Sequence, residues 1–528
     1  MHRNILITLV IATAVALMPA SASADLTADD EFWDLASAAD DDFFGWAVAS
    51  GDFDGDGYID LAIGCPGREV NGFAAAGVVK VLYGDADGIT GTGQQSWHQD
   101  SAGIDNVAET ADHFGSALAA GDFDGDGYTD LAVGAHQEDL GTVDDAGVVH
   151  ILYGSSGGLS SAGSLVLHQG NGMLDIAEAD DHFGYAIVTG DFDGNGYDDL
   201  AIGVPFEDTG AISAAGAAHV LYGGVAGLTT TGQQLWHQNS PGTSGGAEEG
   251  DLFGAALAAG DFDGDGRDDL AIGLPHEDMG TVIVDAGAVH VLRGGYPAGL
   301  VAADDQVWTQ DSPEVTGICE DGDFFGGALT AGDFNGDGSC DLVIGARGED
   351  FESSLIEDAG VLNVLYGGAG GLSATDEYMW YQNRPGMLDT SEADDGFGAV
   401  LAVGDFDGSG YVDLAIGIKD EDIDTIGNAG ATAVMYGTSQ GLGAAGNQFL
   451  YQSGGGLGGW AEPSDAFGYA VAAGDFNGDG ADDLAVGVPF EDLGAVSDAG
   501  TVQVIYAMKG LFSDDFESGD TSGWDSSS

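Results

Sequence analysis

Four aspartates crowd into nine positions of the stretch GDFDGDGYIDLAIG, residues 51–64. Asp52, Asp54, Asp56 and Asp60 follow the pattern Asp-x-Asp/Asn-x-Asp/Asn-Gly-x-x-Asp, which offers hard oxygen atoms at alternate positions. Ca²⁺ prefers such ligands, taking about six to eight oxygens at roughly 2.3–2.6 Å. We therefore predict that these carboxylates and the carbonyl oxygen of Tyr58 bind a calcium ion, which draws the like charges together.

The pattern occurs seven times, in copies that begin at residues 51, 121, 190, 260, 332, 404 and 474. Every replacement within the pattern still carries a side-chain oxygen, and the copy with Ser409 should be the weakest site. We predict up to seven calcium ions, one per repeat. The candidate ligands, with the carbonyl donor in fourth place in each copy, are Asp52, Asp54, Asp56, Tyr58, Asp60; Asp122, Asp124, Asp126, Tyr128, Asp130; Asp191, Asp193, Asn195, Tyr197, Asp199; Asp261, Asp263, Asp265, Arg267, Asp269; Asp333, Asn335, Asp337, Ser339, Asp341; Asp405, Asp407, Ser409, Tyr411, Asp413; Asp475, Asn477, Asp479, Ala481, Asp483.

Two other interpretations of the aspartates are less favourable. An EF-hand needs a glutamate at the twelfth loop position and a helix on each side, whereas Ile63 fills that position here, within a strand pattern. Metal-free Asp/Gly turns would leave like charges unpaired within a few ångströms. The pattern therefore favours a calcium-binding hairpin between two strands.

The elements that position these hairpins are predicted to be short strands. Each repeat reads as an FG-led strand such as 114–122, the apolar strand after the aspartates, an alternating strand such as 146–154, and an aromatic strand that ends in Gln, such as 95–99. Near-constant repeat spacing indicates a repeat architecture. Seven hairpins are present but only six fourth strands, and we predict that residues 31–35 supply the seventh. We therefore predict an all-β, closed seven-bladed β-propeller of four-stranded blades, in which an N-terminal strand completes the last blade.

The predicted boundaries follow from this count. Residues 1–24 combine a basic start, an apolar run and a small-residue cleavage site, as a signal peptide does. The propeller should span residues 25–508, and a Ser/Asp-rich tail without predicted structure occupies 509–528. The repeats lie near 44–99, 114–169, 183–238, 253–310, 325–382, 397–452 and 467–506, with 31–35 completing the last.

The FG at the start of each unit, the aspartate loop and the AG-x-V-x-V-x-YG motif near its end resemble the FG-GAP repeat of integrin α chains. The resemblance covers roughly residues 30–508. It implies a seven-bladed propeller with calcium on one face and ligand recognition on the other. The sequence differs from an integrin chain because it shows no leg domains, membrane span or inserted adhesion domain.

The composition excludes several partners. Ninety acidic and nine basic residues give a net charge of −81, which argues against nucleic acid or an anionic lipid surface. No segment after the predicted signal is long and apolar enough to span a membrane, so we expect an exported chain, secreted or at the cell surface. Three cysteines do not make a disulfide framework. Cys65 should act as a small apolar residue, and a bridge between Cys319 and Cys340 stays open.

Further carboxylates recur on the face opposite the hairpins. An aspartate precedes each FG phenylalanine by two residues, while glutamates stand five residues before it and after the second strand in six units; the first unit has Ala39 and Arg68 there. These carboxylates are either an acidic ligand face or caps for backbone amides. Arg68 and Trp460 are each unique to their unit and are candidate ligand contacts. The histidines occupy two equivalent positions of the repeat, and we expect them on strand surfaces. They are His98, His168 and His237 at one position and His150, His219 and His290 at the other.

No nucleophile elbow, phosphate loop or zinc pattern appears in the sequence. We therefore predict a calcium-binding module for an extracellular protein or polysaccharide, with a role in adhesion, and we expect no enzymatic activity. The alternatives are a calcium-dependent lyase or hydrolase acting on carbohydrate, and a lectin.

Overall fold

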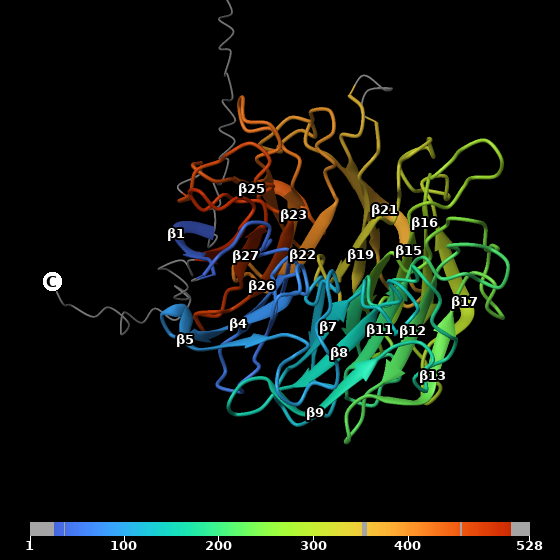
Figure 1. The fold of residues 1–528 in the computed structure, drawn as a ribbon. Coiled ribbons are helices and arrows are strands. Elements are labelled where there is room, and N and C mark those ends of the chain that lie inside the picture. Colours follow the sequence, from blue (N-terminus) through green and yellow to red (C-terminus); the bar gives the residue numbers. More distant parts are fainter. Residues whose placement is uncertain (1–25, 36, 351–355, 455–456, 508–528) are drawn as a thin grey trace, which may run out of the picture.

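Seven four-stranded antiparallel sheets surround a central axis in the computed structural model (Figure 1). The structure describes residues 26–35, 37–350, 356–454 and 457–507. These residues include no helix long and apolar enough to cross a membrane. The predicted signal peptide and the predicted tail lie outside the described residues. The seven-bladed propeller predicted from the repeat count is confirmed.

Each blade runs outward from the axis in the order innermost, second, third and outer strand. The innermost strands are β2 (Ala47–Gly51), β6 (Ala117–Gly121), β10 (Ile187–Gly190), β14 (Ala256–Gly260), β18 (Ala328–Gly332), β22 (Val400–Gly404) and β26 (Ala470–Gly474). The second strands are β3 (Asp60–Cys65), β7 (Asp130–Ala135), β11 (Asp199–Val204), β15 (Asp269–Leu274), β19 (Asp341–Ala346), β23 (Asp413–Ile418) and β27 (Asp483–Val488). The third strands are β4 (Val78–Asp85), β8 (Val148–Tyr153), β12 (Ala217–Tyr222), β16 (Ala288–Arg293), β20 (Val361–Tyr366), β24 (Ala431–Tyr436) and β28 (Thr501–Ala507). The outer strands are β5 (Gly88–Trp97), β9 (Ser160–Leu167), β13 (Thr229–Trp236), β17 (Val301–Trp308), β21 (Ser373–Trp380), β25 (Gly443–Leu450) and β1 (Leu26–Trp33).

The innermost strands form a closed ring around the axis. They contact one another in the order β2, β6, β10, β14, β18, β22 and β26, and β26 returns to β2. Small residues dominate these strands, as in the sequence ALAAG of β6, because the blades converge at the centre. The hairpins between innermost and second strands lie on one face, and the loops after the second strands lie on the other.

The strand β1 closes the ring by completing the last blade. It pairs antiparallel with β28, with Glu31 opposite Val504 and Trp33 opposite Val502. The blade therefore has the order β1-β28-β27-β26, as the missing fourth strand predicted. Closure removes the exposed sheet edges that an open array would leave at its ends.

The FG and AG motifs join one blade to the next. The backbone N–H of Phe114, in the second blade, donates to the Ala76 carbonyl of the first blade at 3.0 Å. Within the second blade, Gly115 N donates to Gly134 O at 2.9 Å. A Cβ at Gly77 would collide with the backbone of Phe114, and Gly77 has a φ of +88°. The close approach of the two motifs therefore requires glycine at this position.

The hydrophobic core lies between the blades. Val79 and Val81 of β4 pack with Leu131 and Val133 of β7 and with Phe114, and all five side chains are buried. Equivalent clusters fill the other blade interfaces, including that between the last blade and the first. Each repeat therefore buries its apolar faces only against its neighbours.

The outer strands differ in extent from the sequence prediction. Strand β5 begins at Gly88 and ends at Trp97, whereas the prediction placed a short strand at 95–99. Strand pairing begins earlier than predicted, with Tyr83 of β4 opposite Thr90 of β5. The glutamine at position 99 lies beyond the strand and is fully buried.

Candidate metal centres and the opposite face

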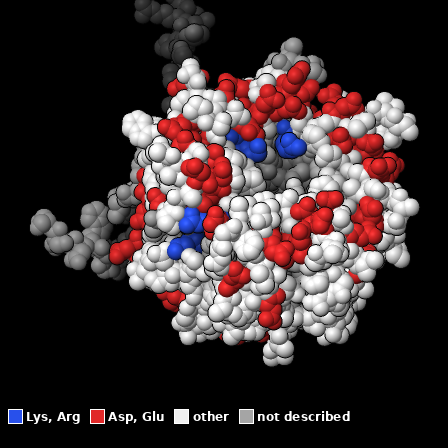
Figure 2. Space-filling model, viewed as in Figure 1, with Lys and Arg blue, Asp and Glu red and all other residues white. Residues whose placement is uncertain are grey.

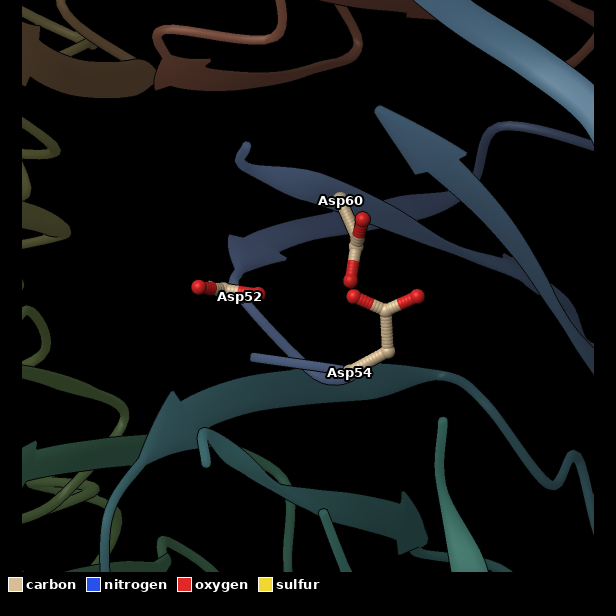
Figure 3. A group of neighbouring side chains, drawn as sticks. All are labelled: Asp52, Asp54 and Asp60. Atoms are coloured by element: carbon tan, nitrogen blue, oxygen red, sulfur yellow. The ribbon is translucent and has the colours of Figure 1, made fainter. Parts of the chain in front are cut away.

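The first hairpin brings three predicted ligands together. One carboxylate oxygen of each of Asp52, Asp54 and Asp60 lies within 4.8 Å of the others. Figure 3 shows the carboxylates of Asp54 and Asp60 facing each other, with Asp52 beside them in the hairpin. The second and third hairpins gather the same positions, namely Asp122, Asp124 and Asp130, and Asp191, Asp193 and Asp199. Carboxylate oxygens at this separation suit a hard cation such as Ca²⁺.

Backbone hydrogen bonds fold each hairpin around its first aspartate. In the first hairpin, Oδ1 of Asp52 accepts from the N–H of Gly55 at 2.7 Å, and Oδ2 accepts from Gly57 N at 3.0 Å. The second of these bonds recurs in all seven hairpins. Gly55 has a φ of +73°, and a Cβ there would collide with the ring of Tyr128. Glycine is therefore required at this position for two reasons, the backbone conformation and the contact with the next blade.

The last aspartate of each hairpin is the buried one. Asp60 accepts N–H bonds from Phe53 at 2.8 Å and from Gly84 at 2.9 Å. Burial is the main cause that raises the pKa of Asp60 to about 7, and the charges of Asp54 and Asp52 add to it, against the two N–H bonds. The equivalent carboxyls Asp130, Asp199, Asp269, Asp341, Asp413 and Asp483 have a pKa raised to about 7 or 8, with burial as the first cause. A bound dication would offset this cost, so the donor set fits calcium.

The fifth hairpin position lies apart from the compact carboxylate group in the first hairpin. Asp56 is exposed, and its Oδ1 accepts from the N–H of Tyr58 at 3.0 Å. It does not belong to the compact group of Asp52, Asp54 and Asp60. The binding roles of Asp56 and of the Tyr58 carbonyl stay predictions.

Adjacent hairpins are linked through their backbones. Thr129 N donates to the Asp52 carbonyl at 2.9 Å, and Asp198 N donates to the Asp122 carbonyl at 3.1 Å. The link between the last blade and the first is the bond of 3.3 Å from Ile59 N to the Asp475 carbonyl. Order in one hairpin therefore supports order in the next.

The fourth hairpin differs because two arginines form ion pairs with its carboxylates. Arg267 Nη1 pairs with Asp265 Oδ2, and Arg293 Nη1 lies 2.9 Å from Asp263 Oδ2. The compact group there is Asp261, Asp263 and Asp265, without the buried aspartate of the first three hairpins. The guanidinium groups already pair with two of these carboxylates, so the fourth hairpin fits a calcium ion less well than the first three do. Sequence reasoning missed Arg293 because it lies on β16, far from the motif.

The glutamates of the opposite face tie each blade to the next. Gln238 Nε2, beyond the outer strand of one blade, donates to Glu277 Oε2 of the next at 2.7 Å. Asp251 Oδ2 accepts from the N–H of Glu248 at 2.6 Å. The same glutamine–glutamate bond joins Gln99 and Glu138, Gln169 and Glu207, Gln310 and Glu349, Gln382 and Glu421, and Gln452 and Glu491. These contacts support the interpretation that the carboxylates anchor the repeat.

Arg68 has a structural partner at the blade junction closed by β1. Its Nη1 lies 2.6 Å from Asp42 Oδ2 and donates to the Ser37 carbonyl at 2.7 Å. The position of Gln99 is filled by Leu35 in this blade, so no amide is available to a glutamate. In this blade the Asp42 carboxylate forms an ion pair with Arg68, which takes the place of the glutamate of the other blades.

Three histidines predicted on strand surfaces are buried instead, so that prediction is wrong. His150, His219 and His290 are at most 2% exposed. The His150 ring packs edge-on against Phe114 with centroids 5.2 Å apart, and burial lowers its pKa to about 3. Trp460, the other candidate ligand contact, is 79% exposed.

All three cysteines are free thiols. Cys65 is buried in the apolar cluster between the last blade and the first, as predicted for a small apolar residue. The bridge left open between Cys319 and Cys340 is absent from the structure.

Comparison with known proteins identifies the repeat. The FG-GAP repeat matches residues 44–82, 114–152, 183–221, 253–292, 325–364 and 467–505. Integrin alpha-PS2 of Drosophila melanogaster is 31% identical over 247 residues, which covers 46% of this chain and 16% of that protein. Phosphatidylinositol-glycan-specific phospholipase D of Rattus norvegicus is 34% identical over 167 residues, covering 31% of this chain and 19% of that protein. The chain thus spans less than a fifth of the length of these two relatives.

The solved structure of rhamnogalacturonan lyase YesW has a TM-score of 0.38 and 12% identity, covering 90% of this chain and 72% of that one. That likeness is too weak to bear on function. The phospholipase D relatives nevertheless overturn the prediction that enzymatic activity is absent, because 167 residues of this chain are 34% identical to part of an enzyme. Enzymatic activity therefore stays open for this chain.

Proposed function

Because this chain is a seven-bladed FG-GAP propeller that resembles the integrin α chains, we propose that it is an exported, calcium-stabilised module that binds a protein or polymer ligand outside the cell. The observation that carries the proposal is the recurring carboxylate group in linked hairpins on one face, in a chain with a net charge of −81. The opposite face, free of these hairpins, is the surface for the ligand.

Calcium would be held by the first and second aspartates of the hairpin and by the buried last one, as in Asp52, Asp54 and Asp60. The ion supplies positive charge that this sequence does not provide through lysine or arginine. Since the hairpin joins the innermost and second strands, its metal affinity adds to the free energy of unfolding. The fourth hairpin contributes least, because Arg267 and Arg293 neutralise it.

A calcium-dependent fold provides a reason for an extracellular site of action. Calcium is abundant outside cells, and extracellular calcium modules work with dissociation constants of about 10⁻⁴–10⁻³ M. The predicted signal peptide at residues 1–24 agrees with that location. The integrin relatives suggest an extracellular protein ligand, whereas the lectin alternative suggests a polysaccharide.

Binding of the full chain to arrays of extracellular proteins and of glycans, each in excess calcium and in excess chelator, tests the proposal. We expect retention on a defined set of ligands in calcium and loss of retention in chelator. Failure to bind any ligand in calcium would contradict the binding role.

A catalytic role is the second candidate, favoured by the similarity to phosphatidylinositol-glycan-specific phospholipase D. Release of product from uronate polymers or phosphodiesters incubated with the chain in calcium would identify it. The two roles are compatible, since an enzyme also binds its substrate.

A further inference from the structure

Three histidines of two neighbouring blades gather at the channel mouth, where the loops before the innermost strands meet those after the second strands, on the face opposite the hairpins. His113 lies shortly before β6, His136 directly after β7, and His182 shortly before β10. The ring centroids of His136 and His182 lie 5.4 Å apart, and those of His113 and His136 lie 6.2 Å apart. His136 therefore stands between the other two rings, and the group spans the junction of the second and third blades.

These separations suit a transition-metal ion with imidazole ligands. Zn²⁺ binds histidine nitrogen at about 2.0–2.1 Å in tetrahedral sites, which places the centroids of two ligating rings roughly 5 Å apart. His136 and His182 already lie at this separation, and rotation of the His113 side chain would bring its ring about 1 Å closer to His136. Imidazole nitrogen suits zinc, copper or nickel, whereas calcium takes oxygen ligands. The group therefore selects a different class of ion from the hairpins.

The ring of His136 is prepared to act as a ligand. Burial lowers its pKa to about 3, and the charges of His182 and His113 lower it further, so the ring is neutral at physiological pH, as metal binding requires. Ser116 Oγ lies 2.7 Å from His136 Nδ1 and 3.4 Å from the Gly134 carbonyl oxygen. When the hydroxyl donates to Gly134, it accepts from His136 Nδ1–H, and Nε2 then keeps its lone pair for a metal.

The ring of His182 has an unused nitrogen. Its Nδ1 is buried and has no hydrogen-bond partner within the part of the chain that the structure describes. Buried polar atoms are normally paired, and leaving one unpaired costs free energy. A metal ion at the junction would give this nitrogen a partner.

Asp145 provides a carboxylate beside the histidines. Its backbone carbonyl accepts from the His182 N–H at 3.2 Å. Burial lowers the pKa of His113, whereas a hydrogen bond with Gln137 and the charge of Asp145 oppose this shift. Burial raises the pKa of Asp145, and the charge of His182 opposes that shift. Asp145 therefore lies close to histidines of both blades, and three imidazoles with one carboxylate complete a set of four ligands.

Aromatic packing alone does not explain the histidines. The junction of the last blade and the first is built in the same way from carbon rings, with Phe43 lying 5.8 Å from Trp46 and 5.6 Å from Phe490. Phe43 occupies the repeat position of His113 and His182. The remaining blades have Leu252, Phe324, Gly396 and Ala466 at that position, and the position of His136 is otherwise filled by Pro66, Pro205, Pro275, Arg347, Lys419 and Pro489. Histidine at these positions is thus confined to the second and third blades, as expected of a site rather than of the repeat.

We propose that His113, His136, His182 and Asp145 bind one divalent transition-metal ion of the zinc class, which joins the second blade to the third. Acidic side chains surround the central hollow on the face drawn in Figure 2, so the surface potential raises the local concentration of cations. Because the ligands come from two blades, the binding free energy of the ion adds to the free energy of unfolding. The proposed ligand-binding function does not depend on this site.

The test begins with the full chain in excess calcium, so that the hairpins do not compete for the added ion. Co²⁺ is then titrated, because its visible absorption is strong in a tetrahedral site with nitrogen ligands and weak in an octahedral oxygen site. Competition between the chain and a chelator of known affinity gives the Kd for Zn²⁺.

Four variants accompany the wild type, each carrying a residue that another repeat has at the same position. His113→Phe and His182→Phe remove one ligand each and introduce the residue of Phe43, and Ser116→Ala removes the partner of His136 and introduces the residue of Ala255. The matched control is His98→Tyr, which changes a histidine beyond an outer strand to the residue of Tyr381. Melting curves establish that each variant is folded.

We expect one cobalt ion per chain with the absorption of a tetrahedral nitrogen site, displaced by Zn²⁺. Loss of a group that only orients a ligand typically weakens metal binding by about 10–100-fold, so Ser116→Ala should cost about tenfold and each loss of a histidine ligand about 100-fold or more. Zinc should raise the melting temperature of the wild type and of His98→Tyr, but not that of His182→Phe.

Weak absorption of the oxygen type alone, zinc affinity that ignores both ligand substitutions, or an equal loss of affinity in His98→Tyr would overturn the proposal. Each of these results would leave the proposed binding function standing, since the protein and glycan arrays test that function separately.

Discussion

Replacing both arginines of the fourth hairpin by tyrosine should create a calcium site there. Arg267 and Arg293 occupy positions that are tyrosine in other repeats, such as Tyr58 and Tyr83 in the first. The double variant Arg267→Tyr/Arg293→Tyr therefore gives the fourth hairpin the ligand positions and the tyrosines of the first. The fold should tolerate the change, because the tyrosine equivalent to Arg293 is accommodated in six other blades.

The expected gain in calcium affinity follows from the distance between the arginines and the bound ion. Arg293 lies 2.9 Å from Asp263 Oδ2, and a calcium ion bound to that carboxylate would sit about 2.4 Å from an oxygen, hence roughly 5 Å from the guanidinium. Coulomb repulsion between a dication and one positive charge at about 5 Å is about 1.7 kcal/mol in water, and two arginines give about 3 kcal/mol. That difference corresponds to a calcium affinity on the order of 10²-fold higher in the double variant.

Native mass spectrometry at a set of calcium concentrations, with isothermal titration calorimetry, measures the stoichiometry. We expect six tight ions in the wild type and seven in the double variant, with an intermediate affinity at the fourth hairpin in Arg293→Tyr alone. Arg384→Gln, which removes a cation far from any hairpin, is the control. Seven equivalent ions in the wild type, or an unchanged count in the double variant, would refute the role of the two arginines.

Three further substitutions test other parts of the fold. Burial, as the first cause, raises the pKa of Glu207 to about 8, so the contribution of this carboxyl to stability is complete below the unfolded value of 4.5 and is lost as pH rises through 8. Glu207→Gln should therefore gain stability relative to wild type between pH 5 and 8, by up to about 1.4 kcal/mol for each step of one in pH, and parallel melting curves across that range would contradict this. Gly55→Ala should lower the free energy of unfolding by about 1–3 kcal/mol, because Gly55 has a φ of +73° and contacts the next blade. The loss should be larger than for Gly57→Ala, since the Cβ position of Gly57 has open space around it. Urea unfolding that ranks the two variants in the opposite order would be inconsistent with the hairpin packing. Arg68→Glu introduces the residue that the other six blades have at this position, yet it should lower the free energy of unfolding by about 3–5 kcal/mol, because buried Asp42 loses its ion-pair partner. A melting temperature equal to that of the wild type would show that this ion pair does not stabilise the blade junction.

The architecture could be predicted because the number and the spacing of the repeated motifs determine it. Seven aspartate hairpins against six fourth strands required a strand from elsewhere, and β1 supplies it. The hairpin ligands could be found because they lie within nine residues of one another. The FG and AG motifs likewise report local backbone requirements, such as the glycine at position 77.

Contacts between blades could not be read from the sequence in the same way. The bond from Gln238 to Glu277 joins neighbouring blades and residues 39 positions apart, and even within the fourth blade the pair between Arg293 and Asp263 spans 30 positions. Burial of His150 depends on contact with Phe114, which lies 36 positions earlier at the start of the same repeat, whereas its alternating strand pattern is typical of a surface residue. The channel mouth, likewise, is assembled from single positions of several blades.

Thermal unfolding of the full chain in excess calcium and in excess chelator tests the calcium-stabilised propeller most directly. A ligand at a hundredfold excess over its dissociation constant stabilises by about 2.7 kcal/mol per site, so six sites give about 16 kcal/mol. With an unfolding entropy of about 2.1 cal/mol/K per residue, the melting temperature should fall by about 15 °C when calcium is removed. Superimposable melting curves in calcium and in chelator would contradict the account.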